Sequence, residues 1–135
     1  MFPQASQSVG AEAPPRRALV VDDEPLIRWS ISEALHDHGY SVVEAGTGRA
    51  AIQELTASSD PFDAIVLDLR LPDSDDLSLL GRIQDLAPRT RIIMMSAHGS
   101  ADMAQEARAR GVYEFVNKPF EISAMATLVD EASRA

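Results

Sequence analysis

The chain has 135 residues, 45% of them hydrophobic and 24% charged, which fits one globular domain around one core and leaves no room for a second. Its formal net charge of -9 argues against direct nucleic-acid binding by this domain, because affinity for the phosphate backbone comes from clustered Lys and Arg. The chain has no cysteine, which excludes disulfides, thiolate metal sites and a cysteine nucleophile.

The N-terminal stretch, residues 1–16, mixes Gln, Ser, Ala, Gly and Pro with little apolar content. This composition is typical of a mobile tail. The stretch lacks the charged-then-apolar pattern of a signal peptide, and no apolar run in the chain is long enough to span a bilayer. We therefore expect a flexible tail, one folded domain over residues 17–135, a cytoplasmic location and no membrane contact.

From residue 18 onward, short apolar runs alternate with segments whose apolar residues recur at the spacing of a helix face. The apolar runs predict five strands, at residues 18–21, 40–45, 64–68, 91–96 and 113–117. The periodic segments predict five helices, which begin near residues 25, 48, 77, 101 and 122. Because strand and helix alternate five times, the pattern predicts an α/β fold with an open, doubly wound parallel sheet covered on both faces.

Residues at the ends of these segments agree with the assignment. Pro25 opens the first helix, where its missing N–H removes no helical hydrogen bond. Gly39 and Gly111 fit C-terminal caps, and Thr47 is the expected N-cap of the second helix. The acids of the loop 72–76 are expected at the N-terminus of the third helix, where negative charge is favoured.

The third predicted strand ends in a carboxylate, Asp68, and polar residues stand at the ends of the other strands. Asp22 and Asp23 follow the first strand, Ser96 ends the fourth, and Lys118 follows the fifth. In open parallel sheets, ligands bind beyond the carboxyl ends of the strands. We therefore expect these five side chains to converge on one edge of the sheet.

Three carboxylates at one edge need a counter-charge, because two like charges about 4 Å apart repel by roughly 4 kcal/mol at an effective dielectric near 20. Oxygen ligands without Cys or His indicate Mg²⁺. Chain order leaves Asp68 open as a metal ligand, a cap or a nucleophile, and a carboxylate can attack phosphorus to form an aspartyl phosphate. We favour the nucleophile, with the Lys118 ammonium and the Ser96 hydroxyl serving the phosphoryl oxygens.

Four separated motifs resemble the receiver domain of two-component response regulators. They are residues 19–25, 66–72, 95–97 and 115–120. The resemblance covers residues 17–133 and implies a flavodoxin-like sheet of strand order 2-1-3-4-5, flanked by five helices. Within the family, Trp29 and the segment 96–99 look most like the receivers of NtrC-type enhancer-binding transcription regulators.

The resemblance also implies a role for each site residue. Asp23, Asp68 and the backbone carbonyl of Arg70 would bind Mg²⁺, and Asp22 would assist through water. Asp68 would take the phosphoryl group from a phosphohistidine of a sensor histidine kinase. Ser96 would then move toward the phosphate and reshape the surface of the fourth helix, fifth strand and fifth helix, which would control transcription.

Further residues receive expected roles from the same resemblance. Phe115 would turn inward as the aromatic switch, and the Lys118–Pro119 bond would be cis. Arg70 and His98 would flank the phosphoryl group and tune its hydrolysis. The expected contacts with the kinase helix bundle are Leu26, Ile27 and Ser30. The other expected partner is a second copy, in a phosphorylation-dependent homodimer, or a downstream output domain.

Two other functions compete with this interpretation. A Mg²⁺-dependent phosphatase-like enzyme also forms an aspartyl phosphate. Such enzymes typically have a second acid two residues after the nucleophile, but this chain has Arg70 there. A flavodoxin-like cofactor binder would need a phosphate-cradling loop after the first strand, where the acids 22–24 would repel FMN phosphate. We expect no turnover of an external substrate, only catalysis of the domain's own phosphorylation and dephosphorylation.

Two positions depart from the family pattern. At the aromatic switch, Phe115 lacks the hydroxyl of a tyrosine, so no hydroxyl hydrogen bond is expected there. Family members commonly carry glycine where this chain has Asp76. Because glycine tolerates positive φ, the loop entering the third helix is expected to differ locally. The site chemistry does not use this position, so we expect it to be unaffected.

Overall fold

A computed structural model describes residues 14–135, so the predicted mobile tail lies outside the described residues except for its last positions, 14–16. One sheet contains the strands β2 (Arg17–Val21), β3 (Ser41–Ala45), β4 (Ala64–Asp68), β5 (Arg91–Ser96) and β6 (Glu114–Asn117). Neighbouring strands pair in parallel. Their order, β3-β2-β4-β5-β6, is 2-1-3-4-5 when counted along the chain, which confirms the predicted topology.

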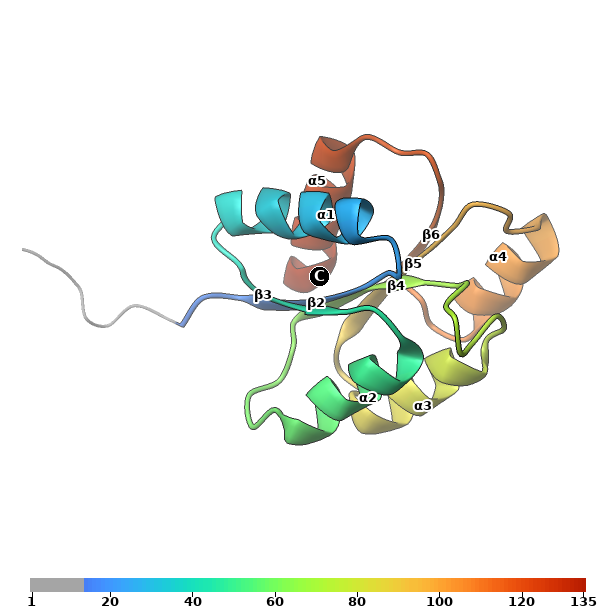
Figure 1. The fold of residues 1–135 in the computed structure, drawn as a ribbon, viewed down its shortest axis with the longest axis horizontal. Coiled ribbons are helices and arrows are strands. Elements are labelled where there is room, and N and C mark those ends of the chain that lie inside the picture. Colours follow the sequence, from blue (N-terminus) through green and yellow to red (C-terminus); the bar gives the residue numbers. More distant parts are fainter. Residues whose placement is uncertain (1–13) are drawn as a thin grey trace, which may run out of the picture.

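Helices alternate with the strands along the chain. They are α1 (Pro25–Asp37), α2 (Gly48–Ala57), α3 (Ser78–Leu86), α4 (Ala101–Ala109) and α5 (Ile122–Arg134). α1 and α5 cover one face of the sheet, and α2, α3 and α4 cover the other (Figure 1). Within residues 14–135, every helix is too short or too polar to cross a membrane.

The central strand, β4, is buried along its whole length. Ile65 and Leu67 lie in the apolar cluster on the α2–α4 side, whereas Ala64 and Val66 lie in the cluster beneath α1 and α5. A strand covered on both faces has no polar side, which explains the continuous apolar run in the sequence. Full burial of each aliphatic side chain contributes about 1.5–3 kcal/mol, so β4 gives Asp68 a firmly packed support.

The helix ends largely follow the sequence signals. Thr47 Oγ1 accepts a hydrogen bond from the Ala50 N–H at 3.0 Å, as expected of an N-cap. Gly39 and Gly111 have φ values of +88° and +98°, which suit the residue after a helix C-terminus. β3 and β6 each begin one residue later than predicted, after Tyr40 and Tyr113, and β2 begins one residue earlier, at Arg17.

The acidic loop before α3 differs from the prediction in one respect. Asp76 accepts a hydrogen bond from the Ser78 N–H at 2.9 Å, at the start of α3 as expected. Asp73 instead accepts from the N–H groups of Gly48 and Arg49, at 2.8 and 3.0 Å, and so caps α2. These bonds hold the pKa of Asp73 below its ordinary value. The order of the sequence predicts that Asp73 caps α3, the helix that follows the loop, whereas in the folded chain the loop lies at the N-terminus of α2.

Two glycine substitutions should change stability in opposite directions. Gly81 lies inside α3, and an added Cβ would meet nothing within 4 Å. Gly81→Ala should therefore raise the free energy of unfolding by about 0.5–1 kcal/mol, through lower chain entropy. Gly111→Ala should lower it by about 1–2 kcal/mol, because its positive φ disfavours a side chain. Urea unfolding of both variants checks this, and shifts of the same sign would contradict it.

Candidate functional site

The predicted site residues meet at the carboxyl edge of the sheet. Asp22 directly follows β2, Asp68 ends β4, Ser96 ends β5 and Lys118 follows β6. Hydrogen bonds between main-chain groups extend the ladder beyond the strands, from the Leu69 N–H to Met95 O and from the Lys118 N–H to Ser96 O, both at 2.9 Å. The backbone therefore fixes where each loop leaves the sheet.

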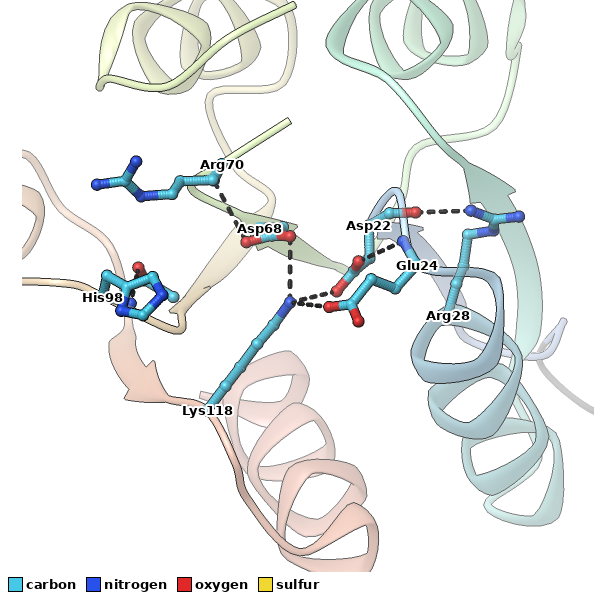
Figure 2. Close-up of polar contacts among 8 residues, drawn as sticks. Asp22, Glu24, Arg28, Asp68, Arg70, His98 and Lys118 are labelled. Carbon is cyan, nitrogen blue, oxygen red and sulfur yellow. Dashed lines mark hydrogen bonds and ion pairs between the residues drawn. The ribbon is translucent and has the colours of Figure 1, made fainter. Parts of the chain in front are cut away.

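Lys118 connects the acids of this edge, as Figure 2 shows. Its Nζ donates to Asp22 Oδ2 at 2.8 Å, to Asp68 Oδ2 at 3.1 Å and to Glu24 Oε1 at 3.4 Å. Only 10% of the Lys118 side chain is exposed. The Lys118–Pro119 bond is cis, as expected. One ammonium thus serves three carboxylates, of which the sequence analysis had named two.

Three carboxylates are close enough to share a cation. Oxygens of Asp22, Asp23 and Asp68 lie within 4.8 Å of one another. Asp22 and Asp68 are buried, whereas Asp23 is exposed, so the cluster has one open side. The Arg70 N–H donates to Asp68 Oδ1 at 3.3 Å, which places the Arg70 main chain beside the cluster. A set of oxygen donors with an open side fits Mg²⁺, which keeps several waters when it binds carboxylates.

The buried charges are unequal in number. Burial, together with the nearby Asp22 carboxylate, raises the pKa of Asp68 to about 6, although Lys118 opposes the shift. Burial works to lower the pKa of Lys118, but hydrogen bonds and charge from Asp22 and Asp68 outweigh it and raise that pKa. The ammonium therefore stays charged, and Asp68 carries the uncompensated part of the negative charge.

Ser96 and Phe115, the predicted switch residues, are joined by a close-packed loop. Ser96 is fully buried, and its Oγ accepts from the His98 N–H at 3.1 Å. Phe115 is 6% exposed, so its ring faces the core in this structure. A Cβ added to Gly99 would lie 2.7 Å from Phe115 Cε1 and 3.3 Å from Ser96 Cβ. Gly99 therefore permits the loop to contact both residues.

The rim of the site carries the other predicted residues. The side chains of Arg70 and His98 are exposed. Leu26 is 73% exposed, while Ile27 and Ser30 are partly buried on α1. A cavity of about 400 Å³ opens beside Lys118; its lining residues are Glu24, Ile27, Ala97, Lys118, Pro119, Phe120 and Ile122. The expected kinase contact thus includes one exposed apolar residue, Leu26, and one residue that lines this cavity, Ile27.

Sequence reasoning missed three residues of the site. Glu24 contacts Lys118, Arg28 donates from Nη1 to the Asp22 carbonyl at 2.6 Å, and Gly99 packs on Phe115. Glu24 and Arg28 are one helical turn apart, and this spacing next to Asp22 was an available signal. For Gly99 the available signal was a glycine three residues after Ser96, in a loop that leaves the sheet at the site.

Comparison with known proteins gives a consistent result. The family model described as the response regulator receiver domain matches residues 18–130. The DNA-binding transcriptional regulator NtrC of Klebsiella pneumoniae is 35% identical over 115 residues, which are 85% of this chain and 24% of NtrC. The chain thus spans about a quarter of the length of that relative. The predicted similarity to NtrC-type regulators is confirmed.

Two solved structures are also similar. The solution structure of the beryllofluoride-activated NtrC4 receiver domain dimer has a TM-score of 0.79 and 36% identity, and the match covers 87% of this chain and 96% of that one. A response regulator protein from Burkholderia pseudomallei, with a phosphorylated aspartic acid, calcium ion and citrate, has a TM-score of 0.76 and 28% identity. That match covers 88% of this chain and 69% of the other.

Replacing Asp68 should stabilise the metal-free protein near neutral pH. Because the pKa of Asp68 is raised from 3.8 to about 6, the folded state binds a proton that the unfolded chain has released between these values. This group therefore lowers the free energy of unfolding as pH rises through that window. At about 1.4 kcal/mol per pKa unit, Asp68→Asn should be more stable by about 1–3 kcal/mol at about pH 8 and nearly equal to wild type at about pH 4.

Urea unfolding with a chelator present measures this difference at both pH values. Asp75→Asn, which changes an exposed loop acid, is the control. The interpretation is wrong when Asp68→Asn is less stable than wild type at the higher pH, or when the two pH values give the same difference.

Proposed function

This chain belongs to the response-regulator receiver domain family, and from that membership we propose that it accepts a phosphoryl group on Asp68. The single observation that carries the proposal is the position of Asp68 Oδ2, 3.1 Å from the buried Lys118 ammonium and within a cluster of three carboxylates. Phosphorylation on an aspartate is a general property of the family. The phosphorylated aspartic acid in the similar structure from Burkholderia pseudomallei supports the same chemistry.

Asp68 is the best nucleophile among the three acids. Asp22 is fully buried and is held more tightly, since Oδ1 accepts from the Glu24 N–H and Oδ2 from Lys118, both at 2.8 Å, whereas the matching contacts of Asp68 are 3.3 and 3.1 Å. Asp23 is exposed, beyond the end of β2. Asp68 stands on the central strand, and Lys118 beside it can neutralise a phosphoryl oxygen. In the transfer, an Asp68 carboxylate oxygen bonds to phosphorus as the phosphorus–nitrogen bond of the donor breaks, and the leaving imidazole takes up a proton.

Receiver domains generally bind Mg²⁺, and we assign the ion to Asp23, Asp68 and the backbone carbonyl of Arg70, with Asp22 acting through water. When bound, the ion supplies positive charge beside the phosphoryl oxygens. The chain's own residues do the rest. Lys118 neutralises, Asp68 attacks, and the Ser96 hydroxyl donates to a phosphoryl oxygen. These steps are positioning and charge neutralisation, which dominate catalysis of phosphoryl transfer.

The partners follow from the family and are part of this proposal. The phosphoryl donor is a sensor histidine kinase, which docks on Leu26, Ile27 and Ser30. This domain then passes the signal on through the surface formed by α4, β6 and α5, and Ser96 and Phe115 are the residues that switch this surface. The output is control of transcription, through an attached or separate domain or through a homodimer, because NtrC is a transcriptional regulator and the NtrC4 receiver forms a dimer. The cytoplasmic location stays a prediction.

The phosphatase-like alternative receives no support. The family match is to the receiver domain, and residue 70 is an exposed arginine where the alternative needs an acid. Receiver domains are signalling domains, and we propose that this one catalyses only its own phosphorylation and dephosphorylation. The flavodoxin-like alternative also loses support, because the family match is to the receiver domain and the loop after β2 carries acids where a phosphate-cradling loop would be needed.

Incubation with acetyl phosphate and MgCl₂, followed by intact mass measurement, tests the assignment. Wild type should gain the mass of one phosphoryl group, and Asp68→Asn should gain none, because the variant lacks the attacking oxygen. Asp75→Asn, an exposed acid outside the cluster, should behave as wild type. Phosphoramidate and a phosphorylated histidine kinase serve as second and third donors. An adduct on Asp68→Asn, or no adduct on wild type from any donor, would refute the proposal.

The lifetime of the phosphoryl group should depend on the rim. Arg70 and His98 are exposed and lie two residues beyond Asp68 and Ser96, where bulky basic groups limit the access of water. The double variant Arg70→Ala, His98→Ala should therefore lose its phosphoryl group several-fold faster than wild type. Dephosphorylation after removal of the donor measures this rate. Arg49→Ala is the control, since Arg49 is exposed at the start of α2. Equal rates for the double variant and wild type would contradict the hypothesis.

A further inference from the structure

Hydrogen bonds fix the Asp22 main chain at both its carbonyl and its N–H group, and one of the partners is an arginine of α1. Arg28 Nη1 donates to the Asp22 carbonyl oxygen at 2.6 Å, and Figure 2 shows the guanidinium on the side of Asp22 opposite Lys118. The Asp22 N–H donates to Ala45 O at 3.1 Å. The side chain is engaged as well, through Lys118 and the Glu24 N–H. We propose that Arg28 is a positioning residue that sets the geometry of the cation site by fixing the Asp22 main chain.

The guanidinium is itself fixed by its surroundings. Arg28 Nε donates to Glu44 Oε1 at 3.0 Å. Glu44, on β3, therefore orients the guanidinium that donates to the loop after β2. A Cβ added to Gly46 would lie 3.3 Å from Arg28 Nη1, so the turn after β3 packs closely on the guanidinium. Only 22% of the Arg28 side chain is exposed. A surface ion pair by itself contributes little to stability. The Arg28 guanidinium, however, is half-buried and donates to two partners, Glu44 and the Asp22 carbonyl, which hold it in one orientation.

Arg28 also belongs to the same helical turn that follows the acidic loop. Its N–H donates to Glu24 O at 3.0 Å, and its carbonyl accepts from Ser32 Oγ at 2.9 Å. The side chain therefore reaches from a regular helix back to the residue two positions before Glu24. This forms a short bracket of α1, the loop 22–24 and β3. These contacts restrain Asp22 from moving away from the sheet.

The bracket suits the needs of a cation site. Bringing acids together before a cation binds is unfavourable, so a cation site needs a rigid support that keeps the acids in place. Arg28 supports the loop without contacting the acids of the cluster, since its Nη1 contact is with the Asp22 carbonyl and its Nε pairs with Glu44. Groups that orient ligands from outside the coordination sphere commonly change metal affinity strongly when they are removed. The inference rests on the proposed function, because the cation is the one proposed above.

A Mg²⁺ titration followed by amide resonances of residues 22–24 and 68–70 tests the inference. Arg28→Met keeps the length of the side chain but removes both donations, and it should weaken Mg²⁺ binding about tenfold, as removal of an orienting partner typically does. Arg28→Lys keeps the charge and one donor, so it should recover part of the loss. Arg82→Met, an exposed arginine on α3 across the sheet, should bind Mg²⁺ as wild type does.

Hydrogen exchange of the metal-free protein gives a readout that does not depend on the ion. Loss of the bracket should speed exchange of the Asp22 and Glu24 amides in Arg28→Met, relative to the amides of β4. Glu44→Gln, which weakens the orienting contact and leaves Arg28 in place, should show both effects in milder form, and it serves when Arg28→Met fails to fold. The inference is overturned when Arg28→Lys and Glu44→Gln, and any folded Arg28→Met, all bind Mg²⁺ within twofold of wild type.

The same samples separate this inference from the proposed function. Wild type without Mg²⁺ binding, or without an Asp68 phosphoryl adduct, would remove the proposed function itself. Wild type that binds and is phosphorylated, beside Arg28 variants that bind equally well, would remove only the role of Arg28. A variant with a lower melting temperature and unchanged Mg²⁺ affinity would show a structural role alone, and it too would overturn the inference.

Discussion

Two buried carboxylates share one buried ammonium, and this shortage of positive charge governs the site. Lys118 Nζ lies 2.8 Å from Asp22 and 3.1 Å from Asp68, and both acids are at least 95% buried. Burying a charge is unfavourable unless it is paired and hydrogen-bonded. Burial and the nearby Asp22 carboxylate raise the pKa of Asp68 to about 6, so the deficit falls on Asp68. The site therefore has an electrostatic reason to bind a cation.

The fold can hold these charges together because the ends of the sheet strands, and not flexible loops, fix the positions of Asp22, Asp68 and Lys118. Lys118 is 50 residues from Asp68 and 96 residues from Asp22 along the chain, so no local structure could bring the three together. Parallel strands in the order found place the ends of β2, β4 and β6 on one edge. The stability of the apolar strands, buried on both faces, holds the charged groups in an unfavourable proximity that a looser support would relax.

Sequence reasoning reached the strands and the strand-end residues because these leave local signals. A continuous apolar run is visible without a structure, and so is a carboxylate at its end, as at Asp68. Contacts between distant segments leave no such signal. Asp73 caps α2 rather than α3, and Arg28 donates to the Asp22 carbonyl. The sequence alone does not indicate which of several polar groups becomes the partner in the folded chain. Gly99 could be noticed as a glycine, but not as the contact between Ser96 and Phe115.

The Gly99 contact also links the charged edge to the face of the molecule formed by α4 and β6. The Phe115 ring, on β6, packs against the loop that leaves Ser96, and the Phe115 carbonyl accepts from Arg108 of α4 at 3.4 Å. Arg108 also donates to Glu114 of β6 at 2.8 Å. Because a close-packed interior has few voids, a displacement of the loop after Ser96 has to displace the ring or be resisted by it. The loop after Ser96 and helix α4 are therefore coupled through packing on Phe115, and the absence of a side chain at Gly99 is what lets the loop come this close to the ring.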